Sequence, residues 1–359
     1  DDENFEAILK GLLKYKQSFK LINPEKIPNY KPKQRQRATR AIFIPNEGWY
    51  NPHLIFEKVY SILSKEKNVK FINSNVKLIN HKRNKILSII LDTKLEIKGD
   101  KFLLCPGASI SNLIKESNLK ISLQRIFYGV GTSIELKNVE NHFHNDCIRT
   151  PNRGLACGIY TVPYNYDKIT KRNHVLVGAT NYISHKPIFS PRASNVSSIL
   201  NSVINQINTN FEKSEIVKIN VGWRPTSSDT YPLIGKTNSY KNLFIVSGTK
   251  REGYHLSPVI SEIIANQIVS NKKNKILNIF HPERKLIRSL TRENAIQKAL
   301  DHLISAAYQH DFIPSDENLE KTLKIAYLDE LNALHDKFKA FDWGIPVEMI
   351  QMYKYGHIK

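Results

Sequence analysis

The chain has 359 residues, of which 41% are hydrophobic and 24% are charged, a composition typical of a globular protein that excludes a disordered chain. The formal net charge is +20, but the lysines are scattered along the sequence. This spread favours a basic surface over a polyanion site in the denser patches 31–40 and 271–292. Three cysteines without CxxC spacing argue against a disulfide framework, and no apolar run is long enough to span a bilayer. We therefore expect a cytoplasmic protein.

The first 120 residues mix helices and strands. Residues 1–30 are predicted to be helical before a loop, and residues 40–52 a short strand and a turn. Pro52 then opens a helix, "HLIFEKVYSILSKEK", whose apolar residues recur at helical spacing. The continuous apolar run in "FLLCPG" predicts a buried strand, with Cys105 as a small core residue.

Residues 121–221 are rich in predicted strands, with one helix among them, "SSILNSVINQINTNF". From about residue 284 onward the pattern becomes helical. Regular alternation of strand and helix is absent from the first half. The sequence therefore favours an α+β or mixed two-domain fold over a simple doubly wound sheet.

The stretch "VGWRPTSSDTYPLIG" places an arginine between a strand-like run and a proline. If Arg224 faces a pocket, its guanidinium is suited to bidentate pairing with a carboxylate; a surface arginine is the alternative. Asp229 is expected to cap a turn, and Gly235 to be a turn glycine. A hydrolase is not indicated, because no nucleophile elbow accompanies Ser227 or Ser228.

The stretch "GTKREGYHLSPV" follows the apolar run "NLFIVS". Gly248 and Gly253 permit a positive φ or a close approach of the backbone to a ligand. Ser257 is a predicted N-cap, and Pro258 fits the first helical position. The start of such a helix favours a ligand with negative charge, and Arg251 adds a cation beside it. A plain capped helix is the alternative reading.

His142 and His144 form an H-x-H pair, but no set of nearby carboxylates and histidines supports a metal site. A surface loop is favoured there, and we expect no metal centre.

Five blocks occur in an order and spacing that resemble the FAD-dependent D-amino-acid oxidase superfamily, and most closely its glycine oxidase and amino-acid dehydrogenase branch. The resemblance covers roughly residues 38–270. The blocks are "AIFIPNEGWYNPHLIFEKVY", "FLLCPGASISNLI", "GIYTVPYNYD…HVLVGATNY", "VGWRPTSSDTYPLIG" and "NLFIVSGTKREGYHLSPVISEIIANQI".

The resemblance implies three catalytic residues. Arg224 would grip the substrate carboxylate, Arg251 would be a second pocket arginine, and Tyr160 would lie on a substrate-domain strand facing the flavin. The implied FAD-binding residues are Val76, Gly107, Ala108, Gly248, Gly253, Tyr254, His255 and Leu256. Thr249 and Tyr164 depart from the histidine and the basic residue that relatives often carry, so the substrate stays open.

The implied fold is a two-domain FAD-oxidoreductase: an incomplete FAD-binding βαβ domain and an antiparallel-sheet substrate domain, with a C-terminal helical extension. The expected parts are a partial N-terminal region (1–52), FAD-domain parts (53–115 and 222–283), the substrate domain (116–221) and the extension (284–359). The extension is open as a lid, an oligomerisation arm or a docking surface.

In this superfamily a Gly-x-Gly-x-x-Gly turn on the first strand and helix cradles the pyrophosphate, and this sequence contains no such motif. Three explanations are open: a truncated or split product, a subunit completed by a partner chain, or a degenerate non-catalytic protein. The downstream motifs favour a split or truncated enzyme whose missing segment a second chain supplies.

The expected function is FAD-dependent oxidation of the C–N bond of an amino acid or related amine, with hydride transfer to the flavin and an imine product. The alternatives are an oxidase domain of the same superfamily that serves tRNA modification, and a non-catalytic scaffold. The expected partner is a small-molecule amine or amino acid; nucleic acid is less favoured, and no membrane span is expected.

Overall fold

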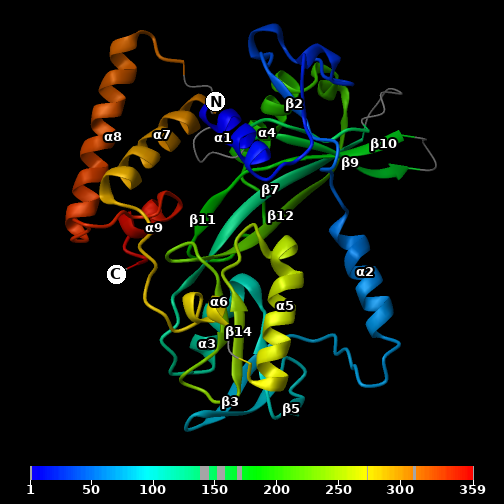
Figure 1. Cartoon of the computed structure of the whole chain (residues 1–359), viewed down its shortest axis with the longest axis vertical. Coiled ribbons are helices and arrows are strands. Elements are labelled where there is room, and N and C mark those ends of the chain that lie inside the picture. The colour runs from blue at the N-terminus through cyan, green and yellow to red at the C-terminus, as the bar shows by residue number, and fades with distance from the viewer. Residues whose placement is uncertain are drawn as a thin grey trace.

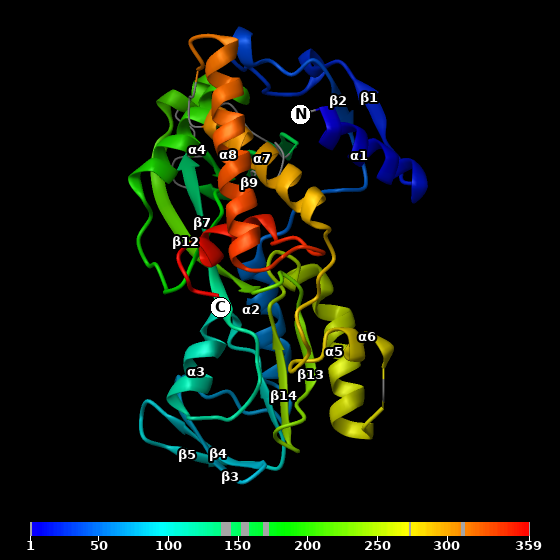
Figure 2. The same ribbon diagram turned by 90° about the vertical axis from the view of Figure 1, so that its left-hand side faces the viewer.

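The computed structural model describes residues 2–137, 145–151, 158–167, 172–272, 274–309 and 313–358. The predicted surface loop with His142 and His144 lies outside these residues, as does Cys157. Figures 1 and 2 show three parts: a large twisted sheet, a smaller mixed part below it, and a group of helices near the C-terminus that lies against the sheet.

The large sheet is antiparallel and is built around β7, which is twelve residues long. β12 pairs with β7 along its whole length, from Glu215 opposite Lys137 to Ser227 opposite Ile126. β10 and β11 also pair with β7, β9 pairs with β10, and β8 pairs with β9. The strands are β7 (Ile126–Lys137), β8 (Ile148–Arg149), β9 (Tyr160–Asp167), β10 (Arg172–Gly178), β11 (Tyr182–Ser184) and β12 (Glu215–Ser227).

One face of this sheet is covered by α4 (Ala193–Gln206) and the short helix η4 (Thr209–Lys213), which confirms the helix expected among the strands. Side chains of β7 and β10 alternate between the two faces, so that Ile134, Leu136, Val175 and Val177 point towards the helix. They pack with Ile199, Val203, Ile207 and Phe211 in one buried cluster. The opposite face of the sheet is left for other uses.

The smaller part combines two three-stranded sheets. In the first, β14 pairs with β6 in parallel and with β13 in the antiparallel sense; in the second, β4 lies between β3 and β5. α3 packs between the sheets, and α5 and α6 pack on β13 through Ile234, Ile264 and Leu277. The bounds are β3 (Val76–Lys82), β4 (Lys85–Leu91), β5 (Glu96–Lys98), β6 (Phe102–Leu104), the short helix η3 (Gly107–Ser109), α3 (Ile110–Glu116), β13 (Leu233–Lys236), β14 (Leu243–Ser247), α5 (Gly253–Ser270) and α6 (Lys275–Ile279).

The N-terminal region corrects one expectation. Helix α1 (Asp2–Lys14) ends early, because Lys16 adopts a φ of 52°, and β1 (Lys20–Ile22) then pairs with β2 (Ala41–Phe43). The strand after residue 40 and the helix opened by Pro52 are confirmed. Helix α2 (Pro52–Leu63) is capped by Asn51, whose side chain accepts a hydrogen bond from His53 N. Two short helices, η1 (Pro24–Lys26) and η2 (Gln34–Gln36), lie between β1 and β2.

Two smaller expectations were wrong. β6 ends at Leu104, so Cys105 lies one residue beyond the strand and is exposed instead of being a core residue. Gly235 lies inside β13 with a φ of 131°, a conformation that a glycine tolerates, and does not form a turn.

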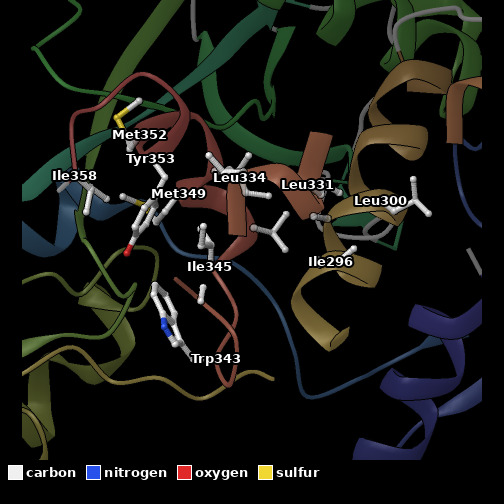
Figure 3. Close-up of a cluster of buried hydrophobic side chains, with 14 of the residues drawn as sticks. Ile296, Leu300, Leu331, Leu334, Trp343, Ile345, Met349, Met352, Tyr353 and Ile358 are labelled. Carbon is white, nitrogen blue, oxygen red and sulfur yellow. The ribbon is translucent and has the colours of Figure 1, made fainter. Parts of the chain in front are cut away.

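The helical character expected from residue 284 onward is confirmed. The C-terminal extension contains α7 (Arg292–Gln309), α8 (Glu317–Lys337), the short helix η5 (Val347–Met349) and α9 (Ile350–Lys354). Its apolar side chains, including Leu334, Ile345 and Met349, form a single buried cluster (Figure 3). Phe127 of β7 belongs to the same cluster, so the extension is anchored to the substrate-domain sheet.

We predict that Ile345→Ala lowers the free energy of unfolding by about 2–5 kcal/mol, because Ile345 is fully buried in this cluster and its truncation leaves a cavity. Denaturant unfolding of the full chain measures the effect. Ile325→Ala is the matched control, since Ile325 is exposed on α8, and it should change the value by less than about 0.5 kcal/mol. Equal effects of the two variants would contradict the role assigned to the cluster.

Candidate functional site

A row of paired residues crosses the face of the large sheet that lies opposite α4. Arg149 pairs with Tyr160, Tyr160 with Gly178, Gly178 with Ser133, and Ser133 with Asn220. Side chains of directly paired residues point to the same side of a sheet, so all five belong to one face. We call this face the floor of the site.

Two glycines keep the floor low enough to hold large polar side chains. A methyl group on Gly131 would lie 2.2 Å from Nη1 of Arg224, and one on Gly178 would lie 2.6 Å from the hydroxyl oxygen of Tyr160. The guanidinium and the phenol therefore occupy the space that side chains at these two positions would fill. The glycines in "YGVGTS" and "LVGAT" thus shape the site.

Arg224 is held from the side by its neighbours in the sheet. Its Nη1 donates to the backbone oxygen of Thr180 at 3.3 Å and to Oδ1 of Asn181 at 3.2 Å. The side chain is half-buried and lines the cavity described below. Of the two alternatives, a pocket-facing and a surface arginine, the structure has the pocket-facing one.

The roof of the site is the loop after β14 together with the first turns of α5. Gly248 and Lys250 have positive φ values of 71° and 55°, and the Lys250 amide donates to the Pro225 carbonyl at 2.9 Å, which ties the loop to β12. The Glu252 amide donates to the Thr249 carbonyl at 2.8 Å and closes the turn before the helix.

The predicted start of this helix was wrong by one turn. Helix α5 begins at Gly253, and Pro258 lies inside it. A proline there cannot donate to the Tyr254 carbonyl, and the Ser257 hydroxyl does so instead, at 2.7 Å. Ser257 therefore repairs the helix within its second turn and does not cap its start.

Between floor and roof lies a cavity of about 960 Å³. It is lined by three predicted catalytic residues, Tyr160, Arg224 and Arg251, and by two predicted FAD-binding residues, Gly253 and Tyr254. The structure thus brings together residues that are up to 94 positions apart in the sequence, as the separation of Tyr160 and Tyr254 shows.

The other six predicted FAD-binding residues do not line this cavity. Gly248 and Gly107 lie at neighbouring strand ends, where the Ser247 hydroxyl donates to the Gly107 carbonyl at 2.9 Å. Ala108 is buried, and Val76 opens β3 in the second small sheet. His255 pairs with Glu252 on the exposed side of α5, where Leu256 is half-buried.

The C-terminal extension reaches the roof through one carboxylate. Glu348 lies 2.5 Å from Nζ of Lys250, and its other oxygen lies 3.8 Å from Nη2 of Arg251. The Glu348 side chain is only 12% exposed, so both interactions are shielded from solvent. Burial lowers the pKa of His302 on α7, with Glu348 opposing and Arg251 reinforcing that shift.

A second link between the extension and the body is the buried ion pair of Arg284 with Asp229. Asp229 also accepts hydrogen bonds from the amides of Tyr231 (3.0 Å) and Ile287 (2.8 Å), so its predicted role in a turn is confirmed and extended. Burial alone would raise the pKa of Asp229, but Arg284 and these amides together hold it below its usual value of 3.8.

Sequence reasoning missed Arg149, Lys250 and Glu348. Arg149 shares no motif with the rest of the site and enters it only through strand pairing. Lys250 adjoins Arg251 and stood inside the quoted loop, so its proximity to the site was the one available signal. Glu348 comes from a segment about one hundred residues away, and nothing in the local sequence marks it.

Other kinds of site find no support in the described part of the chain. Its histidine, cysteine and acidic side chains form no group of three that is suited to holding a metal ion. None of its helices combines the length and the apolar character needed to cross a membrane.

Comparisons with known proteins agree with this architecture. A family model described as FAD dependent oxidoreductase (DAO) matches residues 1–267. The bifunctional protein ThiO/ThiG of Nostoc sp. is 28% identical over 127 residues, which are 35% of this chain and 18% of that protein. The chain therefore spans less than a fifth of the length of the curated relatives it matches.

Two solved structures share the fold. Glycine oxidase from Bacillus cereus has a TM-score of 0.63 at 18% identity, over 80% of this chain and 73% of that one. Iminodiacetate oxidase from Chelativorans sp. has a TM-score of 0.59 at 16% identity, over 74% of this chain and 67% of that one. The mixed two-domain fold expected from the sequence is confirmed.

We predict that Asp229→Asn destabilises the chain in a pH-dependent way. The folded pKa lies below the unfolded one, so the stability that Asp229 contributes is complete above about pH 4 and is lost as the pH falls through the folded pKa. At pH 7 the variant should lose about 3–5 kcal/mol, because Arg284 is left buried without its ion pair. Urea unfolding should show this loss shrinking between pH 5 and pH 3. A loss that stays constant over this range would be inconsistent with the ion pair as its source.

We also predict that Glu348→Gln loosens the roof. The variant leaves Lys250 and Arg251 without their shared counter-charge, so hydrogen exchange of the 248–252 amides should accelerate and the free energy of unfolding should fall by about 1–3 kcal/mol. Glu330→Gln is a matched control in the same extension, because it breaks the exposed pair with Lys354 and should cost less than about 1 kcal/mol. Unchanged exchange in the loop of Glu348→Gln would refute the link.

Proposed function

Because this chain belongs to the family of FAD-dependent oxidoreductases, we propose that it oxidises the C–N bond of an amino acid or related amine, to give an imine. The observation that carries this proposal is the placement of Arg224. Its guanidinium lies on the floor over Gly131 and lines a cavity whose roof contains the start of α5. A substrate carboxylate paired with that guanidinium would be held between the floor and the roof.

Each predicted catalytic residue receives a role in binding or orientation. Arg224 binds the carboxylate in a bidentate manner, and its contacts with Thr180 and Asn181 fix the plane of the guanidinium. Arg251 adds positive charge from the roof, with its position set by Glu348. Tyr160 lies beside Gly178 and limits the width of the cavity on the floor.

The described residues fit a flavin at the roof. The first turn of α5 carries backbone N–H groups that no helical carbonyl uses, and these favour a group on which negative charge develops. Beside β6, Gly107 has a φ of 58°, and the space in front of it is open, since a Cβ there would meet no heavy atom within 4 Å. When bound, FAD supplies the hydride acceptor of the oxidation.

The residues that would hold the cofactor form three groups. Gly248, Gly253, Tyr254, His255 and Leu256 would lie along the ring, Gly107 and Ala108 beside the pyrophosphate, and Val76 near the adenine. Support comes from the hydrogen bond between Ser247 and Gly107, which aligns the ends of β14 and β6. Loops that follow neighbouring parallel strands commonly bind such groups.

We further propose that a separate βαβ segment with a Gly-x-Gly-x-x-Gly turn, carried by a second chain, completes the cofactor site. Two surfaces support this. Among the described strands, β6 pairs only with β14, so its other edge is open to a further strand. Helix α2 has no buried residue and exposes a continuous set of apolar side chains, namely Leu54, Ile55, Phe56, Val59, Tyr60, Ile62 and Leu63.

We predict that co-expression with a βαβ segment taken from a glycine oxidase yields a complex with flavin absorbance bands that oxidises small amino acids. Arg224→Ala should lower kcat/KM by about a hundredfold or more, because a charge-assisted bidentate contact is lost. Gly131→Ala should produce a similar loss by displacing the guanidinium, while Arg83→Ala, in an exposed turn, should have no effect. A folded complex without flavin bands would refute the proposed function.

A further inference from the structure

The floor carries a second arginine at the far end from Arg224. Arg149 on β8 pairs with Tyr160 on β9, so its side chain belongs to the same face as those of Tyr160 and Arg224. Arg149 also lines the cavity. Neither the motifs of the sequence nor the proposed oxidation assigns it a role.

The two arginines stand on either side of a shallow stretch of floor. The guanidinium of Arg224 lies over Gly131 on β7, and three strand spacings, about 14 Å, separate β7 from the backbone of Arg149. The floor between them carries Gly178 and the phenol of Tyr160. A small ligand lying across this stretch would have one arginine at each end.

The charge around the cavity is strongly positive. Four cationic side chains line it, Arg149, Arg224, Lys250 and Arg251, and the described lining residues include no aspartate or glutamate. Glu348 contacts two of these cations from the roof side and offsets one positive charge. An excess of three positive charges therefore faces the contents of the cavity, more than a single carboxylate would balance.

From this placement we infer that Arg149 binds a second acidic group of the substrate. The substrate class is then an amino acid or secondary amine with two carboxylates, one on Arg224 and the other on Arg149. The inference rests on the proposed function, because it concerns the substrate of that same cavity. Selectivity follows from differential binding: a di-acid gains a charge-assisted contact with Arg149 that a mono-acid cannot make.

The test compares two ligands that share a secondary amine and one carboxylate: iminodiacetate, which has a second carboxylate, and N-methylglycine, which has none. Both are titrated calorimetrically into the full chain without flavin. We expect iminodiacetate to bind at least about tenfold more tightly, as a gain of one charge-assisted hydrogen bond implies. Arg149→Gln should remove this preference with little effect on N-methylglycine, and Arg149→Lys should retain part of it.

Arg35→Gln is the matched control, because it removes the same charge from an exposed position outside the cavity and should leave the preference intact. Equal binding of the two ligands, or a preference that persists in Arg149→Gln, would overturn the inference.

The same variants in the flavin-loaded complex separate this inference from the function beneath it. Amine oxidation that is equally fast for both ligands, and unaffected by Arg149→Gln, overturns the di-acid class while the oxidation stands. Flavin uptake without any amine oxidation refutes the function, and an Arg149-dependent preference in the calorimetry then still supports the second anion site. A selective rise in KM for iminodiacetate in Arg149→Gln, with kcat little changed, supports both.

Discussion

The long antiparallel pairing of β7 with β12 is the constraint on which the site depends. It fixes Arg224 opposite Gly129 and Gly222 opposite Gly131, so that the guanidinium can reach over a position without a side chain. The same strand receives β10 on its other side and thereby places Gly178 and Tyr160 in register with Ser133. A slip of one residue in this pairing would turn Arg224 to the opposite face and abolish the floor.

The roof depends on parts of the chain that are distant in sequence. The loop after β14 is tied to β12 by the bond from Lys250 to Pro225, and to the C-terminal extension by Glu348. The extension is itself anchored to β7 through Phe127 (Figure 3) and to the body through Asp229 and Arg284. Floor, roof and extension thus form one connected structure, which assigns the extension a role in support of the cavity.

Much of the fold followed from the sequence, because its signals are local. The helix opened by Pro52, the strand-rich middle and the C-terminal helices could be read from periodicity and turn residues. The early end of α1, the exposure of Cys105 and the start of α5 could not, since each depends on a single backbone angle or on a hydrogen bond such as that from Ser257 to Tyr254.

The site was predicted where motifs mark it and missed where pairing creates it. Arg224, Arg251 and Tyr160 lie in stretches that resemble a known family, and the structure places all three around one cavity. Arg149 and Glu348 belong to no motif, and only the register of β8 with β9 and the packing of the extension bring them near. Their chemistry is ordinary in the sequence and becomes specific only through position.

The contact between Glu348 and Lys250 also bears on how the protein is made. Residue 348 leaves the ribosome about one hundred residues after residue 250, so the loop that roofs the cavity is synthesised long before the carboxylate that holds it. Contacts across such separations form late, since the intervening chain must first be ordered. Newly made protein would therefore pass through a stage in which the sheet is folded and its floor is laid down while the roof is still open, and ligand binding would mark the end of folding.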